Sequence, residues 1–200
     1  MIQIFPLFSS SLIIINTDLD TSQLQNDNIK FKETQSGGGT EISKDIRILK
    51  KYPKLENSIL NEFKTVAKES FKYTNDFVIT TSWITKAKYR TYSQFHLHKN
   101  SFYSGIYYYG KYFEDSGGLE FENPLWEYND FYVHPKQYSF STATSYSFTP
   151  TSNLLVFFPS YLKHRITEHK HRSDRYSLAF NIIPIGEYGI GDSTYNTSWT

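Results

Sequence analysis

The sequence contains no cysteine. This absence excludes a disulfide framework, a thiolate nucleophile, and any zinc or iron–sulfur site that cysteine would ligate. A metal site in this chain must therefore use nitrogen and oxygen ligands from His, Asp and Glu side chains. Six histidines are available for such a site.

Long apolar runs are also missing. No segment approaches the roughly 18 consecutive apolar residues that a membrane-spanning helix needs, so we expect no membrane association. The run from Met1 to Ile15 resembles an export signal, but it lacks a basic start and a small-residue cleavage site, and Pro6 interrupts it. We interpret this run as a strand and predict a cytoplasmic protein.

The chain has no excess of charge of one sign. Twenty-one Lys and Arg residues face 20 Asp and Glu residues, which gives a net charge of +1. This balance provides no overall field that would attract nucleic acid or an anionic membrane. Lys86, Lys88 and Arg90 alternate with Tyr89 and Tyr92, but so few cations in a neutral protein are typical of a solvated strand face. We therefore do not expect a nucleic-acid partner.

The 200 residues, of which 38% are hydrophobic, are enough for one domain with a substantial core. We predict a single domain over 1–200, with an N-terminal strand, loop and helix over 1–75, a β core over 76–185 and a tail over 186–200. The polar, glycine-rich segment 16–41 is predicted to be a mobile surface loop. This segment and 114–147 are both long enough to act as lids.

The spacing of apolar residues predicts the secondary structure. Between Tyr52 and Phe71 they recur at helical intervals, and Pro53 stands where a first helical turn tolerates it. Beyond that helix the pattern changes to short β-branched and aromatic runs, clearest at 77–84, 104–109, 154–158 and 176–182. Because irregular linkers separate these runs, we expect antiparallel pairing. The sequence predicts a mainly β barrel or two-sheet sandwich with one α-helix packed outside.

Three of the histidines favour a metal site. His96 and His98 are two residues apart, and residues i and i+2 of a strand point to the same face. His164 follows a predicted buried strand and would supply a third imidazole from a neighbouring strand. Three imidazoles suit iron, zinc, copper or nickel and leave coordination positions open for oxygen or water. His169 and His171 lie in a polar segment that is predicted to be a surface loop.

Arg175 and Ser177 begin the last strong strand and face the same way, again at i and i+2. A guanidinium binds a carboxylate through two parallel charge-assisted hydrogen bonds, and a nearby hydroxyl adds a third. The pair therefore favours a carboxylate-binding site. A solvated Arg175 paired with Asp174 or Glu168 is the alternative that the residues leave open.

Several blocks of the sequence together resemble the 2-oxoglutarate- and iron(II)-dependent oxygenases of marine bacteria and their phages, which are relatives of the prolyl 4-hydroxylases. The blocks lie, in order, at 37–38, 82–83, 96–108, 117–124, 155–164 and 175–181, so the resemblance covers nearly the whole chain. It implies a double-stranded β-helix, the cupin-like jelly roll, for the core. It also implies Fe(II), 2-oxoglutarate as cosubstrate and O2.

The resemblance also implies a role for individual residues. His96 falls on the first metal ligand and His164 on the distal histidine. Arg175 falls on the residue that binds the far carboxylate of 2-oxoglutarate, with Ser177 as its hydroxyl companion.

One position departs from the superfamily. Where its members normally offer a carboxylate two residues after the first histidine, this chain has His98. We expect His98 to be the third ligand, because its spacing from His96 needs no rearrangement. Glu120 and Glu122 are the alternative sources of the missing carboxylate.

We predict from these observations an enzyme that couples oxidative decarboxylation of 2-oxoglutarate to hydroxylation of a C–H bond. The second substrate is a small molecule or a protein side chain. Two other functions stay open: a cupin-type enzyme with a three-histidine metal that does not use 2-oxoglutarate, and a noncatalytic jelly-roll binding module. Dependence on 2-oxoglutarate separates the first from our prediction, and metal content separates the second.

Overall fold

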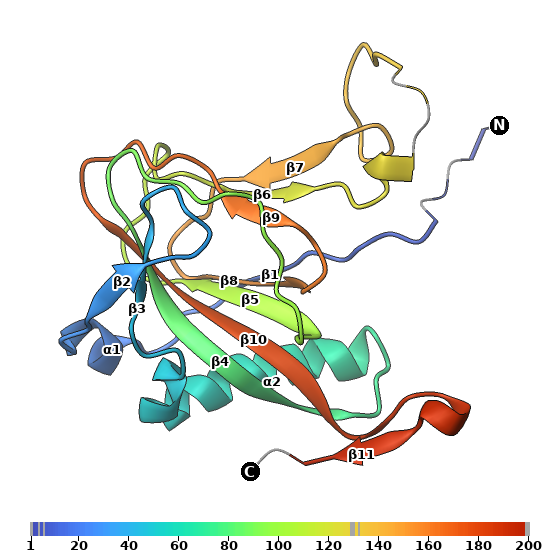
Figure 1. Cartoon of the computed structure of the whole chain (residues 1–200), viewed down its shortest axis with the longest axis horizontal. Helices are drawn as coiled ribbons and strands as arrows, with labels where there is room; N and C mark the ends of the chain where they lie inside the picture. Colours follow the sequence, from blue (N-terminus) through green and yellow to red (C-terminus); the bar gives the residue numbers. More distant parts are fainter. Residues whose placement is uncertain (1, 4, 6, 129–130, 132, 199–200) are drawn as a thin grey trace.

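The computed structural model describes residues 2–3, 5, 7–128, 131 and 133–198, and it consists mainly of two facing antiparallel sheets (Figure 1). The large sheet has the order β1 (Ile13–Asn16), β8 (Leu154–Pro159), β5 (Tyr103–Tyr108), β10 (Arg175–Tyr188), β4 (Asp76–Ala87), β3 (Glu41–Ser43) and β2 (Phe31–Glu33). The short strand β11 (Tyr195–Thr197) pairs with the end of β10. The small sheet has the order β7 (Ser145–Phe148), β6 (Leu119–Glu122) and β9 (His164–Ile166). This is the predicted mainly β jelly roll.

The helix α2 (Pro53–Glu69) lies against the outer face of the large sheet (Figure 1). Its bounds confirm the predicted helix, and Pro53 occupies the first turn. One face of α2 is buried through residues at helical spacing, which are Leu55, Ile59, Phe63 and Ala67. These side chains form a core with the outward-facing residues of β4, β10, β5 and β8. The predicted supporting helix is therefore present.

A second apolar core fills the space between the two sheets. It includes Leu119 and Phe121 from β6 and Val156 and Phe158 from β8. Every residue of β5 and β8 is buried, because these central strands of the large sheet contact α2 on one face and the small sheet on the other. The four strands that the sequence predicts most clearly correspond to β4, β5, β8 and β10.

Two predictions for the N-terminal part are wrong. Within 1–15 the described strand is confined to β1 from Ile13 onward, and Met1, Ile4 and Pro6 lie outside the described residues. The segment 16–41 is not a long loop, since it contains the helix α1 (Ser22–Asn26) and the strand β2. Leu24 of α1 is buried in the core next to α2, and this burial stabilises a segment whose polar composition predicted a loop.

The second predicted loop, 114–147, also contains regular structure. It includes the whole of β6, the start of β7 and the single turn η2 (Trp126–Tyr128). Pairing of β6 with both β7 and β9 holds its first part in the small sheet. A lid formed by all of 114–147 is therefore excluded.

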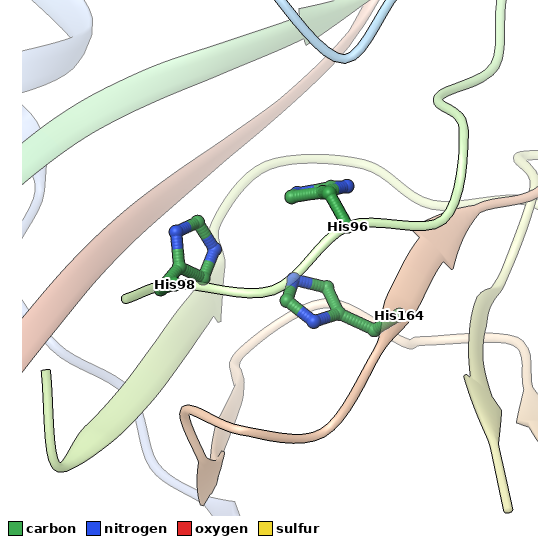
Figure 2. A group of neighbouring side chains, drawn as sticks. All are labelled: His96, His98 and His164. Carbon is green, nitrogen blue, oxygen red and sulfur yellow. The ribbon is translucent and has the colours of Figure 1, made fainter. Parts of the chain in front are cut away.

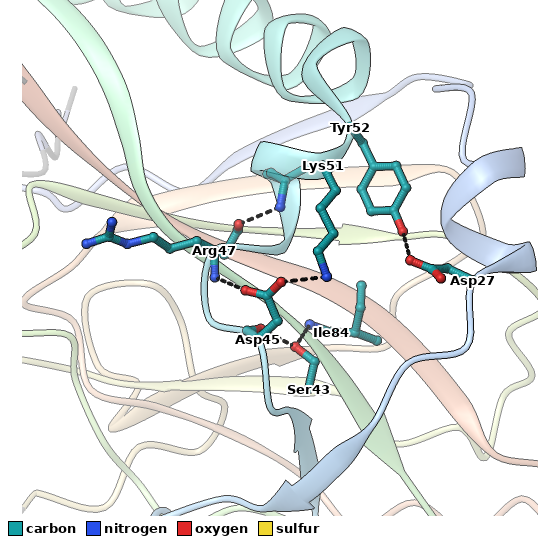
Figure 3. Close-up of polar contacts among 9 residues, drawn as sticks. Asp27, Ser43, Asp45, Arg47, Lys51, Tyr52 and Ile84 are labelled. Carbon is teal, nitrogen blue, oxygen red and sulfur yellow. Dashed lines mark hydrogen bonds and ion pairs between the residues drawn. The ribbon is translucent and has the colours of Figure 1, made fainter. Parts of the chain in front are cut away.

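Polar contacts join the chain before α2 to the large sheet (Figure 3). The Ser43 hydroxyl donates to the Asp45 carbonyl (2.7 Å) and accepts from the Ile84 N–H (3.1 Å). The Asp45 carboxylate accepts from the Arg47 N–H (2.9 Å) and pairs with Lys51 (2.9 Å), and these contacts hold its pKa below the usual range. This network fixes the turn η1 (Ile48–Lys51) and so the start of α2.

Within the described residues, none of the helices combines the length and the apolar character that crossing a membrane requires.

Candidate metal centre

His96, His98 and His164 converge at one end of the space between the sheets, with their rings turned toward one another (Figure 2). Their candidate ligand atoms all lie within 4.8 Å of one another. The ring centroids of His96 and His164 are 4.6 Å apart, and that of His98 is 5.3 Å from the first and 5.1 Å from the second. Three imidazoles at this separation can bind a single ion.

The backbone brings the three rings together. His96 and His164 form an antiparallel bridge with reciprocal N–H to carbonyl hydrogen bonds of 3.0 and 2.9 Å. The His98 N–H donates to the Ser160 carbonyl (3.1 Å), which precedes β9. The expectation that His96 and His98 lie on a regular strand is wrong, because the only ladder pairing of this segment is the single bridge at His96. Their imidazoles converge nevertheless.

Second hydrogen bonds fix which nitrogen of each outer ring faces the centre. The Nδ1–H of His96 donates to the Gln94 carbonyl (2.8 Å), and that of His164 donates to the Leu162 carbonyl (2.9 Å). A carbonyl only accepts, so Nδ1 carries a proton in both rings, and Nε2 is the nitrogen that is left to bind an ion. This orientation is typical of histidine ligands, whose other nitrogen donates to a carbonyl or carboxylate.

The surroundings favour the neutral form of two of these rings. Burial, followed by the nearby His96, lowers the pKa of His98 to about 4 and that of His164 to about 3. Burial dominates because an imidazolium loses its hydration in this environment. Metal binding needs the neutral imidazole, so the site is prepared for an ion at neutral pH.

The alternative ligands Glu120 and Glu122 point away from the three histidines. They alternate along β6 with Leu119 and Phe121, whose side chains enter the core between the sheets. The Glu120 carboxylate accepts from Arg165 Nε (2.6 Å) and pairs with it, and Glu122 pairs with Lys163 (3.2 Å). A carboxylate from β6 would have to break its ion pair and cross the sheet to reach the centre.

The three histidines share a cavity with apolar and small polar side chains. Its lining includes Trp83 of β4, Ser104 and Ile106 of β5, Phe158 of β8 and Ala179 of β10. These residues exclude bulk water from the inner side of the centre. Because Ala179 lines the cavity, the face of β10 that contains Ala179 is the one that points toward the site.

Arg175 and Ser177 lie on that same face of β10 and are both buried, each 3% exposed. Arg175 Nη1 donates to the carbonyls of Ser116 (3.0 Å) and Gly117 (2.8 Å). Its Nε is buried and has no hydrogen-bond partner among the described residues. The alternative of a solvated Arg175 paired with Asp174 or Glu168 is wrong, because Asp174 pairs with Lys86 (3.0 Å) and Arg175 is buried.

The sequence did not indicate the other residues around Arg175. Tyr108 is buried and Tyr112 half-buried near its guanidinium, and desolvation raises the pKa of both phenols while the positive charge opposes that rise. The Tyr112 hydroxyl donates to the Tyr176 carbonyl (2.5 Å). The three tyrosines at 107–109 are all buried, as aromatic side chains in a central strand usually are, and Tyr108 in addition lies near the cationic Arg175.

The turn that meets Arg175 depends on a glycine. Gly117 has a φ of +71°, and a Cβ there would lie 2.6 Å from the Thr167 carbonyl oxygen. Only glycine combines this backbone conformation with such a close approach. The turn at 113–118 can therefore pack directly on the segment that follows β9.

The prediction that His169 and His171 lie in a surface loop is wrong for His169. His169 is buried, 1% exposed, and both of its ring nitrogens lie against carbonyl oxygens. His171 stacks on Phe113 with ring centroids 3.8 Å apart. The basic residues Lys86 and Lys88 pair with Asp174 (3.0 Å) and Glu41 (2.8 Å).

Comparison with known families decides the identity of the chain. Residues 81–181 match the family model described as "Putative 2OG-Fe(II) oxygenase". The chain belongs to this 2OG-Fe(II) oxygenase family. The match spans the metal-site histidines together with Arg175 and Ser177. No curated protein matches the chain.

Solved structures of other 2OG-Fe(II) oxygenases share the fold at low sequence identity. HygX from Streptomyces hygroscopicus, with nickel and 2-oxoglutarate bound, superposes with a TM-score of 0.59 at 10% identity, covering 88% of this chain and 83% of that one. A Pseudomonas putida prolyl-4-hydroxylase gives 0.55 at 12% identity, with 88% and 94% covered. A prolyl hydroxylase from Trichoplax adhaerens, in complex with a hypoxia inducible factor peptide fragment, gives 0.56 at 13% identity, with 86% and 82% covered.

The residues present fit the family's cofactors. Three imidazoles form a donor set that suits ferrous iron. The buried, unpartnered Nε of Arg175 is a donor that lacks an acceptor, and a bound carboxylate would supply one.

Proposed function

We propose that this 2OG-Fe(II) oxygenase is a dioxygenase that hydroxylates a C–H bond of its second substrate. The balanced reaction converts the substrate, 2-oxoglutarate and O2 into the hydroxylated product, succinate and CO2. The observation that carries the proposal is the convergence of three imidazoles with ligand atoms within 4.8 Å, in a chain whose residues 81–181 match this family.

His96, His98 and His164 would hold the iron. When bound, ferrous iron supplies the activation of O2 that is coupled to decarboxylation of 2-oxoglutarate. The Nδ1 bonds of His96 and His164 keep their Nε2 lone pairs directed at the centre, and so preorganise the site. Because all three ligands are neutral, the positive charge of Fe(II) is left for anionic 2-oxoglutarate to balance.

Arg175 would bind the far carboxylate of 2-oxoglutarate. With Nη1 committed to two carbonyls, Nε lies on the side of the guanidinium that is still free to donate. Arg175 precedes Ala179, which lines the metal cavity, by four residues on the same face of β10, so their Cα atoms are about 13 Å apart along the strand. Ser177 lies between them on that face.

Aromatic side chains that pack on the histidines would help to exclude water from the site. Trp83 packs near His98 with ring centroids 5.5 Å apart, and Phe158 packs on His164 at 4.6 Å. Removal of water around the reacting groups strengthens their electrostatic interactions and prevents side reactions. The second substrate, a small molecule or a protein side chain, would approach from the opening of the cavity. The compartment that we propose for the protein is the cytoplasm.

An enzyme with a three-histidine metal and no need for 2-oxoglutarate is the second candidate. The presence of His98 in place of a carboxylate favours it. The unpartnered Nε of Arg175 favours our proposal, because a buried guanidinium donor implies an anionic ligand at that position.

Anaerobic titration with Fe(II) and then 2-oxoglutarate tests the proposed function. We expect a weak visible charge-transfer band that appears only when both are present, followed by succinate formation on admission of O2. A band without any dependence on 2-oxoglutarate would favour the second candidate. Absence of stoichiometric metal binding would favour a noncatalytic binding module instead.

A further inference from the structure

His169 has an unusual hydrogen-bonding environment. The ring is buried, its Nδ1 lies 2.8 Å from the Ser116 carbonyl oxygen, and its Nε2 lies 2.8 Å from the Ser173 carbonyl oxygen. A carbonyl oxygen only accepts, whereas a neutral imidazole has one N–H and one lone pair. Both contacts are satisfied only when each ring nitrogen carries a proton.

The Ser116 carbonyl links this ring to the proposed cosubstrate anchor. It accepts from His169 Nδ1 and also from Arg175 Nη1 (3.0 Å). An imidazole and a guanidinium therefore converge on one oxygen in the buried turn at 113–118. The position of that turn determines the direction in which Arg175 presents its unpartnered Nε.

Acidic side chains do not neutralise this pair. Asp115 and Asp174 pair with His171 (3.5 Å) and Lys86 (3.0 Å), and Glu114 and Glu168 are exposed. Among the described residues, neither His169 nor Arg175 takes part in an ion pair. The carboxylates of the turn, Glu114 and Asp115, therefore leave the charge of Arg175 unpaired.

The other charged and titratable groups around His169 and Arg175 do not neutralise their positive charge either. The backbone of His169 exchanges hydrogen bonds with Arg90 and Thr91, and the Arg90 guanidinium stacks on Tyr89. On the side of Arg175, burial raises the pKa of the Tyr108 and Tyr112 phenols, which keeps both neutral at ordinary pH. Neither side supplies an anion.

We propose that His169 is a doubly protonated positioning residue that holds the turn at 113–118 and, with Arg175, forms a two-cation receptor for a carboxylate. This inference rests on the proposed function for the identity of the carboxylate, which is the far end of 2-oxoglutarate. His169 does not touch the ligand, because both of its nitrogens are engaged. It fixes the Ser116 carbonyl, which accepts a hydrogen bond from Arg175 and so orients its guanidinium. It also adds positive charge to a buried site.

The protonation of His169 can be measured without reference to activity. Nitrogen-15 NMR of the full-length protein, with the His169 signals assigned by comparison with His169→Gln, reports whether each ring nitrogen carries a proton. At neutral pH we expect two protonated nitrogens in the metal-free protein. A His169 signal from an unprotonated ring nitrogen under these conditions would overturn the proposal.

The effect on the cosubstrate is tested with His169→Gln, which keeps a donor but loses the charge, and with Lys170→Gln, which removes a charge from an exposed side chain, as the matched control in the same segment. Residues that act through a neighbour typically change binding by about 2- to 30-fold, so we expect roughly tenfold weaker binding of 2-oxoglutarate to the Fe(II)-loaded His169→Gln protein. Fe(II) affinity should not change, and Lys170→Gln should bind 2-oxoglutarate like the wild type.

The two proposals fail in different ways. Wild-type affinity for 2-oxoglutarate in folded His169→Gln would overturn the positioning role and leave the proposed function intact. A wild-type protein that binds Fe(II) but not 2-oxoglutarate would overturn the proposed function, and the ring-nitrogen signals would still decide the protonation of His169. Circular dichroism of each variant establishes that it is folded before binding is measured.

Discussion

The two faces of β10 are both buried, yet their chemistry is opposite. One face contributes to the core under α2 through Tyr176, Leu178, Phe180 and Ile182. The other face looks between the sheets and carries three buried polar side chains, which are Arg175, Ser177 and Asn181. Burial by itself therefore does not distinguish structural from functional positions in this strand. The distinction lies in whether each buried group has a partner within the protein.

Asn181 and Arg175 show that difference on the same face. The Asn181 side chain accepts from the Ser104 hydroxyl (2.8 Å) and donates to the Thr81 hydroxyl (2.9 Å), so it is satisfied within the fold. Arg175 retains a buried donor without a partner. Since native proteins satisfy nearly all buried polar groups, the exception indicates a site for a ligand.

The largest expected effect comes from the metal ligands. Replacement of His164 by Ala removes one of three imidazoles and leaves a buried gap, so we expect severe loss of Fe(II) binding and of succinate formation. The same result is expected for His96→Ala and His98→Ala. Metal content after equilibration with Fe(II) provides the measurement. Full occupancy in both His96→Ala and His164→Ala would show that the ligand set is wrong.

Arg175→Ala is expected to have the next largest effect. Truncation of one partner of a buried charge pair costs about 2–5 kcal/mol, which corresponds to roughly 30-fold to several thousand-fold weaker binding of 2-oxoglutarate. Arg175→Lys should be intermediate, because it keeps the charge but loses the two-pronged geometry. Ser177→Ala should cost about 1.5–3 kcal/mol at most, since it removes one hydrogen bond to a charged group.

Titration of each Fe(II)-loaded variant with 2-oxoglutarate measures these differences. Fe(II) affinity without 2-oxoglutarate serves as the control, because neither Arg175 nor Ser177 is a proposed metal ligand. An unchanged dissociation constant for Arg175→Ala would remove the main structural reason for assigning 2-oxoglutarate to this site.

Phe63→Ala tests the opposite face of the large sheet. The Phe63 ring packs on Phe77, Tyr103 and Phe157, with centroids 5.0, 5.1 and 5.3 Å away. Its truncation should lower the free energy of unfolding by about 3–5 kcal/mol, as measured by denaturant titration. The folded fraction should keep wild-type affinity for 2-oxoglutarate. A loss of that affinity would show that the two faces of the sheet are coupled.

The stability of the metal-free protein is also expected to depend on pH. The pKa values of His98 and His164 are lowered to about 4 and about 3 in the folded protein, from 6.5. Below pH 6.5 the unfolded chain therefore binds protons that the folded chain does not, and stability falls as the pH approaches these folded values. Thermal unfolding of the metal-free protein from neutral to acidic pH measures this loss. His164→Gln should show a shallower dependence, and an identical profile would contradict this assignment.

Local patterns along the chain were enough to predict several helices and strands. Helical spacing predicted α2, and β-branched and aromatic runs predicted β4, β5, β8 and β10. The spacing of His96 and His98 indicated two imidazoles that converge, although their segment forms one bridge rather than a strand. Periodicity carries this information because each residue's face depends on its immediate neighbours in the chain.

Contacts between groups that are far apart in the sequence could not be predicted from such local patterns. The turn at 113–118 reaches Arg175 because Gly117 permits close packing on the segment after β9, and no local pattern predicts that contact. The same packing buries His169 between two carbonyls, although its polar sequence context predicted a surface loop. Pairing of β6 in the small sheet turned Glu120 away from the metal centre. Such contacts depend on how sheets close over long sequence separations, where polarity and spacing along the chain carry no information.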